Sequence, residues 1–138
     1  MATFKTTFPV RYYETDQMAV VHHSNYIRWM EEARGYFLSN IGWPYDRMEK
    51  EGIVSPVTAV ECKYRRSTTF PDEVSIRVYI QSFNGIRLCV GYEMKNADEQ
   101  IVCTGHTEHC FLDENGKIVR MSREYPEFCE AIAEYIEE

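Results

Sequence analysis

The sequence predicts an α+β domain in which one antiparallel sheet of about five strands wraps around a single long helix, with a further helix at the C-terminus. Three observations predict this arrangement. Apolar residues recur at helical spacing between residues 24 and 40, and inward apolar residues alternate with outward ones over residues 74–80. Asn84–Gly85 is a two-residue hairpin signal and Asn115–Gly116 a second turn, so the strands should pair antiparallel. The chain of 138 residues is expected to form a single domain, residues 1–138.

The long helix follows a predicted first strand, TTFPVRYY, whose inward face includes Phe8. Ser24 or Asn25 is the expected N-cap, and Asn40 with Gly42 should end the helix. One face of this helix is predicted to be buried in the core. That face consists of Tyr26, Met30, Ala33 and Phe37, with Trp29 and Leu38 beside them.

After the long helix and a short helix, the spacing of apolar residues changes from helical to strand-like, and turn signals separate the elements. They are a short helix over 43–50, strands over 54–65, 74–80, 86–94 and 100–112, and a terminal helix that begins at Pro126. After the second turn the chain is expected to continue as a further strand-like segment over 117–121. Such a sheet has open edges, and edge pairing into a dimer is one way of covering them.

Charge and hydropathy limit the classes of function. The net charge of −7 argues against a nucleic-acid surface, and the short basic run from Lys63 to Arg66 suits a small phosphorylated ligand instead. The sequence has neither a run of eighteen apolar residues nor an apolar signal peptide, so we expect a soluble, cytoplasmic protein without a membrane span.

The cysteines and histidines favour structural roles over metal binding. The five cysteines are odd in number and scattered, which predicts buried, reduced thiols. The segment HTEHC at 106–110 lies in a predicted strand, so His106 and His109 should point to opposite faces of the sheet. We therefore expect no metal and no cofactor.

The segment YYETDQMAVVHHSNYIRWMEEAR, residues 12–34, places an acid and two histidines at the entrance to the long helix. Unpaired amides and the helix dipole at such an entrance polarise a carbonyl oxygen docked against them. A carboxylate such as Asp16 can attack that carbonyl or activate water. The plain alternative is that Asp16 caps a turn and that His22 and His23 face solvent.

This segment resembles the signature of hotdog-fold acyl-CoA thioesterases of the 4-hydroxybenzoyl-CoA type. The positions in register are Asp16, Val20, Val21, His23, Asn25, Tyr26, Arg28, Trp29, Glu32, Ala33 and Arg34. The later segment KYRRSTTFPDEVSIRV is similar to the strand–turn–strand of the same family, with Asp72 at the turn. The resemblance implies a hotdog fold, formed here by the antiparallel sheet and its central helix.

Carried over residue by residue, the resemblance makes Asp16 the catalytic carboxylate, either as nucleophile or as general base. The amide near His23 would polarise the thioester carbonyl, and the His23 side chain would position Asp16 or water. Tyr13 would assist at the end of the strand, with Tyr12 an equal candidate. Ala19 stands where glycine is common, so the loop is expected to be tighter or to take another path.

The implied activity is hydrolysis of acyl-CoA to free acid and CoA, in lipid metabolism. The CoA phosphates would meet Arg65 and Arg66, with Lys63 as a weaker candidate. Tyr26, Trp29 and Val57 either line the acyl pocket or pack in the core. In the family the site lies between subunits, which implies a homodimer or homotetramer. An acyl-carrier-protein thioesterase and a non-catalytic binder of acyl ligands are the alternatives.

Overall fold

The computed structural model describes residues 2–137, and its elements follow the predicted order. They are β1 (Phe4–Pro9), a 3-10 turn η1 (Tyr12–Glu14), α1 (Ser24–Asn40), α2 (Tyr45–Lys50), β2 (Val57–Tyr64), β3 (Glu73–Phe83), β4 (Leu88–Lys95), β5 (Ile101–His109), α3 (Met121–Glu124) and α4 (Pro126–Ala133).

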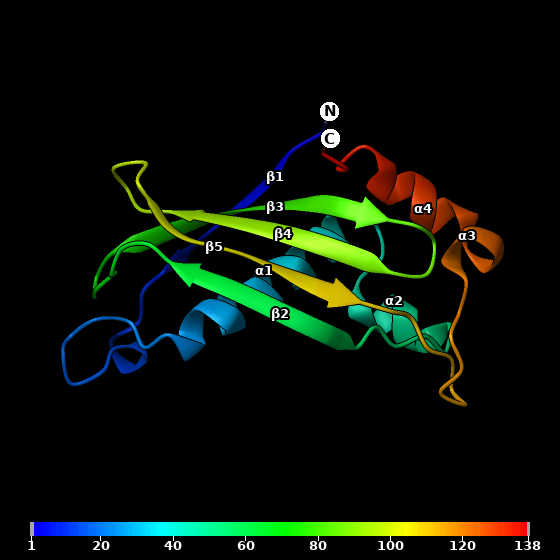
Figure 1. The fold of residues 1–138 in the computed structure, drawn as a ribbon, viewed down its shortest axis with the longest axis horizontal. Helices are drawn as coiled ribbons and strands as arrows, with labels where there is room; N and C mark the ends of the chain where they lie inside the picture. Colours follow the sequence, from blue (N-terminus) through cyan, green and yellow to red (C-terminus); the bar gives the residue numbers. More distant parts are fainter. Residues whose placement is uncertain (1, 138) are drawn as a thin grey trace.

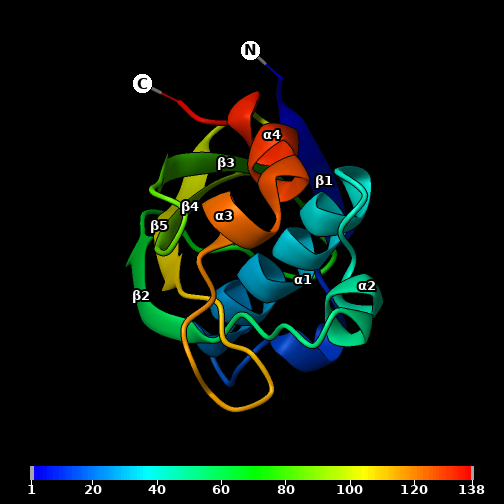
Figure 2. The same ribbon diagram turned by 90° about the vertical axis from the view of Figure 1, so that its right-hand side faces the viewer.

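The five strands form one antiparallel sheet in the order β1-β3-β4-β5-β2. Figure 1 shows the strands running across the molecule with α1 behind them, and Figure 2 shows the sheet curling around α1. The predicted α+β hotdog arrangement is therefore confirmed. Strands β1 and β2 form the two edges, and the β2 edge ends beside the first turn of α1 (Figure 1).

The predicted inner face of α1 is buried in full. Its six apolar residues are at most 5% exposed, and they pack in one core with the inward residues of β3 and β4. Burying one large apolar side chain is worth roughly 1.5–3 kcal/mol, so this face fixes α1 against the sheet. At Gly105 a Cβ would collide with Met30 of α1 and with the Glu61 carbonyl of β2, which explains the glycine in the centre of a strand.

A polar chain crosses this apolar core. The Arg34 guanidinium donates to the Tyr92 hydroxyl at 3.0 Å, Tyr92 and Thr107 are joined at 2.8 Å, and Thr107 meets His109 Nε2 at 2.7 Å. Arg34 can only donate, so the Tyr92 hydroxyl accepts from it, and the donor in the bond to His109 Nε2 depends on the tautomer of the histidine. By strict geometry the His109 Nδ1 has no hydrogen-bond partner within residues 2–137, although the backbone of Ser55 and Pro56 lies close to the ring. Burial, followed by the charge of Arg34, lowers the pKa of His109 to about 4.

Three local predictions were wrong. The first strand ends at Pro9, and the tyrosines that follow lie in η1, where the Glu14 side chain accepts the Arg11 N–H at 2.7 Å. The first hairpin loop has four residues, 84–87, because Asn84 Oδ1 accepts two backbone N–H groups. Residues 117–121 form no strand: Ile118 makes one isolated bridge, and Met121 begins α3.

The C-terminal helix begins at Pro126 as predicted and buries Phe128 and Ile132. It closes one end of the molecule together with α3 (Figure 2). Beyond it, Ile136 forms a bridge with Ile80 of β3. Within residues 2–137, the helices are too short or too polar to traverse a lipid bilayer.

The cysteines are less buried than expected. All five are free, but only Cys103 is fully buried, and the other four are half-buried. His106 and His109 lie on opposite faces of β5 as predicted, with His109 buried and His106 half-buried.

Candidate active site

The loop that precedes α1 folds back on itself with Asp16 at its base. Thr15 and Val21 are bridge partners, and the Asp16 N–H donates to the Val20 carbonyl at 2.8 Å. The Asp16 Oδ1 accepts the Met18 N–H at 2.8 Å, which is the turn-capping role of the plain alternative. The side chain is half-exposed, so its carboxylate still reaches solvent.

Ala19 adopts the left-handed conformation that a glycine would supply. Its φ is +63°, and its carbonyl accepts a hydrogen bond from Thr69 Oγ1 at 2.7 Å. A left-handed conformation costs a non-glycine residue roughly 1–2 kcal/mol. Ala19 therefore adopts a positive φ in this loop, and the loop bears that strain.

Glu14 anchors this loop to α1 and was not predicted from the sequence. It is 5% exposed, and its Oε2 accepts the indole N–H of Trp29 at 2.9 Å. Its backbone carbonyl accepts the Asn25 side-chain amide at 2.8 Å and the His22 N–H at 2.9 Å. A buried indole N–H needs an acceptor, and that requirement of Trp29 is the one signal in the sequence that points to a nearby polar partner.

The start of α1 leaves one amide unused. His23 is the N-cap, not Ser24 or Asn25, because the His22 ring caps the helix: its Nδ1 accepts the Ser24 N–H at 3.2 Å. The Asn25 and Tyr26 N–H groups donate to the carbonyls of the two histidines. Within residues 2–137 the His23 N–H has no acceptor, and His23 is exposed. A free amide at this helix end is a donor for an incoming oxygen.

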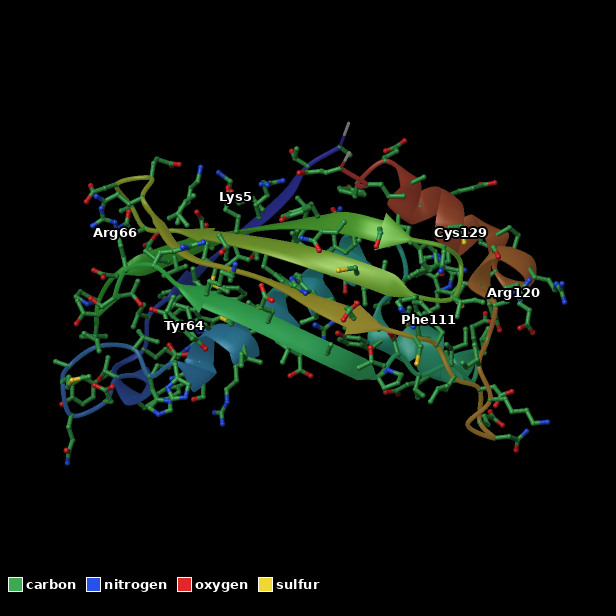
Figure 3. All side chains as sticks on the ribbon, in the orientation of Figure 1. Lys5, Tyr64, Arg66, Phe111, Arg120 and Cys129 are labelled. Carbon is green, nitrogen blue, oxygen red and sulfur yellow. The ribbon has the colours of Figure 1, made fainter. Side chains whose placement is uncertain are left out.

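An open cleft of about 250 Å³ lies at this end of α1. It is lined by Val21, His23, Tyr26, Tyr64, Arg65, Arg66 and Ser67. The cleft therefore brings together four predicted site residues: His23, Tyr26, Arg65 and Arg66. Figure 3 shows Tyr64 and Arg66 at the same end of the sheet.

Tyr64 is a member of the cleft that sequence reasoning missed. Its hydroxyl donates to the His23 carbonyl at 3.3 Å, and its ring lies 5.3 Å from that of Tyr26. Partial burial and the neighbouring Cys62 thiol raise the pKa of Tyr64 to about 12, so the hydroxyl stays protonated. Burial also raises the pKa of Tyr26, whose hydroxyl meets Thr68 Oγ1 at 2.7 Å. Both tyrosines can thus donate hydrogen bonds at neutral pH.

The other predicted residues, including Asp16, do not line this cleft. Tyr13 is 78% exposed on η1, not at a strand end, and Trp29 is buried. Lys63 projects from the face of β2 opposite to Tyr64 and lies 4.0 Å from Glu61. Val57 is exposed at the far end of β2.

Within residues 2–137, no hydrogen bond joins the ring of His23 to Asp16. It lies 4.2 Å from the ring of His22 and 6.1 Å from that of Tyr64. A larger open groove, of about 550 Å³, follows the outer face of α1 towards α2, but the free His23 amide is not part of it.

The sequence matches the thioesterase-like superfamily over residues 10–134. The protein belongs to this superfamily. It is similar to the putative acyl-CoA thioesterase YneP of Bacillus subtilis, at 30% identity over 129 residues, 93% of this chain and 94% of the relative. It superposes on a DHNA-CoA thioesterase structure from Staphylococcus aureus with a TM-score of 0.90 and 35% identity, covering 97% of this chain and 91% of that one.

A hypothetical protein from Aquifex aeolicus also superposes on this thioesterase-like chain, with a TM-score of 0.86 and 32% identity, covering 94% of this chain and 98% of that one. Membership of the superfamily and these structural neighbours confirm the resemblance to hotdog thioesterases that the segment 12–34 suggested.

Proposed function

We propose that this protein hydrolyses acyl-CoA thioesters, with Asp16 as the catalytic carboxylate and the His23 amide as the group that polarises the thioester carbonyl. The observation that carries the proposal is the unused His23 N–H at the start of the 17-residue helix α1. The loop of Asp16 leads directly into that helix start. The names of the similar proteins, an acyl-CoA and a DHNA-CoA thioesterase, support the same reaction class.

The chemistry needs little more than these two groups. The amide and the positive end of α1 stabilise negative charge on the carbonyl oxygen in the transition state. Asp16 either attacks the carbonyl carbon or takes a proton from an attacking water. The leaving thiolate has a conjugate acid with a pKa of about 8.5, so it departs without a strong general acid.

The cleft suits the CoA portion of the substrate. Arg65 and Arg66 are exposed and held beside the His23 end of α1, because both of their amides donate to the Val102 carbonyl of β5. Guanidinium groups bind phosphate oxygens through paired hydrogen bonds. We place the CoA phosphates at these arginines, with the thioester towards His23.

A homodimer formed along β2 would complete the site from a second chain. Strand β2 is an edge of the sheet, and its side chains Val57, Val60 and Tyr64 are between 46% and 48% exposed. An open edge with exposed apolar side chains is a surface for pairing. Sedimentation of the wild type and of Val60→Lys tests this, since a charge at the interface should shift a dimer towards monomer. An unchanged mass would exclude pairing along β2.

A substrate panel tests the function itself. Release of free thiol is followed for aromatic and aliphatic acyl-CoAs and for the same acyl groups on acyl carrier protein. We expect turnover of at least one acyl-CoA and little of the acyl-carrier-protein forms, because the carrier and this chain, with its net charge of −7, are both acidic. Saturable binding of acyl-CoA without thiol release would instead establish a non-catalytic binder, and turnover of the carrier-bound forms alone would establish the other alternative.

A further inference from the structure

Two free thiols lie in contact on adjacent strands, next to Tyr64 of the cleft. Cys62 is on β2 and Cys103 on the adjacent β5, where Cys103 pairs with Tyr64 and is therefore the diagonal neighbour of Cys62. Their sulfur atoms are 3.2 Å apart. Cys103 is fully buried, whereas Cys62 is half-buried on the face of β2 that carries Tyr64.

The two thiols differ in reactivity. The hydrogen bond from Cys103 outweighs the opposing effect of burial and lowers the pKa of Cys62 to about 7. The same Cys62 interaction, together with burial, raises the pKa of Cys103. Because the thiolate is the attacking form of cysteine, the more accessible member of the pair is also the more nucleophilic one at neutral pH.

We propose that Cys62 and Cys103 form a redox-modification site that a low-molecular-weight disulfide, such as glutathione disulfide, converts into an intramolecular disulfide. The Cys62 thiolate attacks one glutathione sulfur, forms a mixed disulfide and expels one glutathione thiolate. Cys103 then loses its proton to solvent, and its sulfur attacks Cys62 and expels the second glutathione thiolate. Two protein thiols are oxidised, and one glutathione disulfide is reduced to two thiols.

The geometry allows the second step with a small movement. The sulfur atoms must approach from 3.2 Å to the disulfide length of about 2.05 Å. This shift of about an ångström draws the Cys62 sulfur towards β5.

The other thiols provide an internal comparison. Cys89 donates to Gln81 at 2.9 Å, and burial, followed by the charge of Glu108, raises its pKa. Burial also raises the pKa of Cys129. At neutral pH these two cysteines should be protonated and slow to react, although they are about as accessible as Cys62.

The test follows the covalent state of the protein, so it does not depend on the proposed hydrolysis. Reduced wild-type protein is treated with glutathione disulfide at pH 7.5 and analysed by intact mass and non-reducing peptide mapping. We expect loss of two hydrogens and a single Cys62–Cys103 link that dithiothreitol reverses. Cys103→Ser keeps a hydroxyl that can donate to Cys62 but cannot form a disulfide, so the reaction should stop at a glutathione adduct on Cys62, formed about fivefold faster than any adduct on Cys89.

Cys89→Ala is the matched control and should oxidise as the wild type does. In Cys62→Ala no internal link should form, and Cys89, Cys103 and Cys129 should react slowly. A stable glutathione adduct on wild-type Cys62, or oxidation of Cys89 or Cys129 ahead of the pair, would overturn the proposal. The wild-type map alone decides this point, even if a variant does not fold.

Discussion

The buried His109 should make the stability of the fold depend on pH in a defined window. Its pKa in the folded protein is about 4, against about 6.5 in the unfolded chain. Below pH 6.5 His109 therefore binds a proton in the unfolded chain, whereas in the folded protein it binds one only below about pH 4. Stability is complete above pH 6.5 and is lost as the pH falls through this window.

The size of the effect follows from the two pKa values. A pKa unit is worth about 1.4 kcal/mol, so the full loss is roughly 3 kcal/mol, of which about 2 kcal/mol is lost by pH 5. Urea denaturation followed by tryptophan fluorescence, from pH 7.5 to 5, measures it. His109→Gln should be less stable than the wild type at pH 7.5. Between pH 7.5 and 5, however, its free energy of unfolding should fall by about 2 kcal/mol less than that of the wild type.

Other titrating groups are shared by all variants, so the difference between curves isolates His109. His106→Gln changes the same residue type on the opposite face of β5 and should follow the wild type. If the curves of the wild type and His109→Gln stay parallel between pH 6.5 and 5, the buried neutral histidine and its hydrogen-bonded chain to Arg34 are wrongly assigned.

Three further changes test the site by other measurements. Glu14→Gln leaves only one side-chain oxygen for two donors, the Trp29 indole N–H and the Arg11 N–H, and should cost about 1–3 kcal/mol in chemical denaturation, whereas an unchanged midpoint would deny Glu14 its anchoring role. Ala19→Gly removes the strain of the left-handed residue and should raise the free energy of unfolding by up to about 1 kcal/mol; a loss would show that the strain is absent. Arg66→Ala should raise KM for acyl-CoA about tenfold but leave KM unchanged for a short thioester without phosphates. Equal effects on both substrates would remove Arg66 from phosphate binding.

The sequence was most informative where one period dominates a whole element. The helical spacing from Tyr26 to Phe37 and the alternation from Val74 to Ile80 each describe a single buried face, so α1 and β3 could be predicted along with their orientation. The hairpin turns then determined the antiparallel pairing. The exact length of the first loop depended on Asn84 side-chain hydrogen bonds, which no periodicity reveals.

The site was harder to predict because its contacts join residues distant in sequence. Tyr64 reaches His23 across 41 positions, and Glu14 binds Trp29 across 15. The resemblance indicated His23 and the arginines, but the choice of the His23 amide depends on His22 capping the helix. His22 caps the helix and His23 supplies the free amide, and residue type alone does not distinguish these two roles.

The proposed hydrolysis assigns the chemistry to Asp16 and the polarisation of the carbonyl to the free His23 amide. A comparison of three proteins tests the role of Asp16. Thiol release from the best acyl-CoA of the panel is measured for the wild type, Asp16→Asn and Asp113→Asn. Asp113 is a matched control, because its Oδ1 also accepts the N–H of the residue two positions later, in a turn after β5. We predict that Asp16→Asn loses at least about 100-fold in kcat while it still binds acyl-CoA, and that Asp113→Asn keeps wild-type turnover. Near wild-type kcat in a folded Asp16→Asn variant would contradict the mechanism.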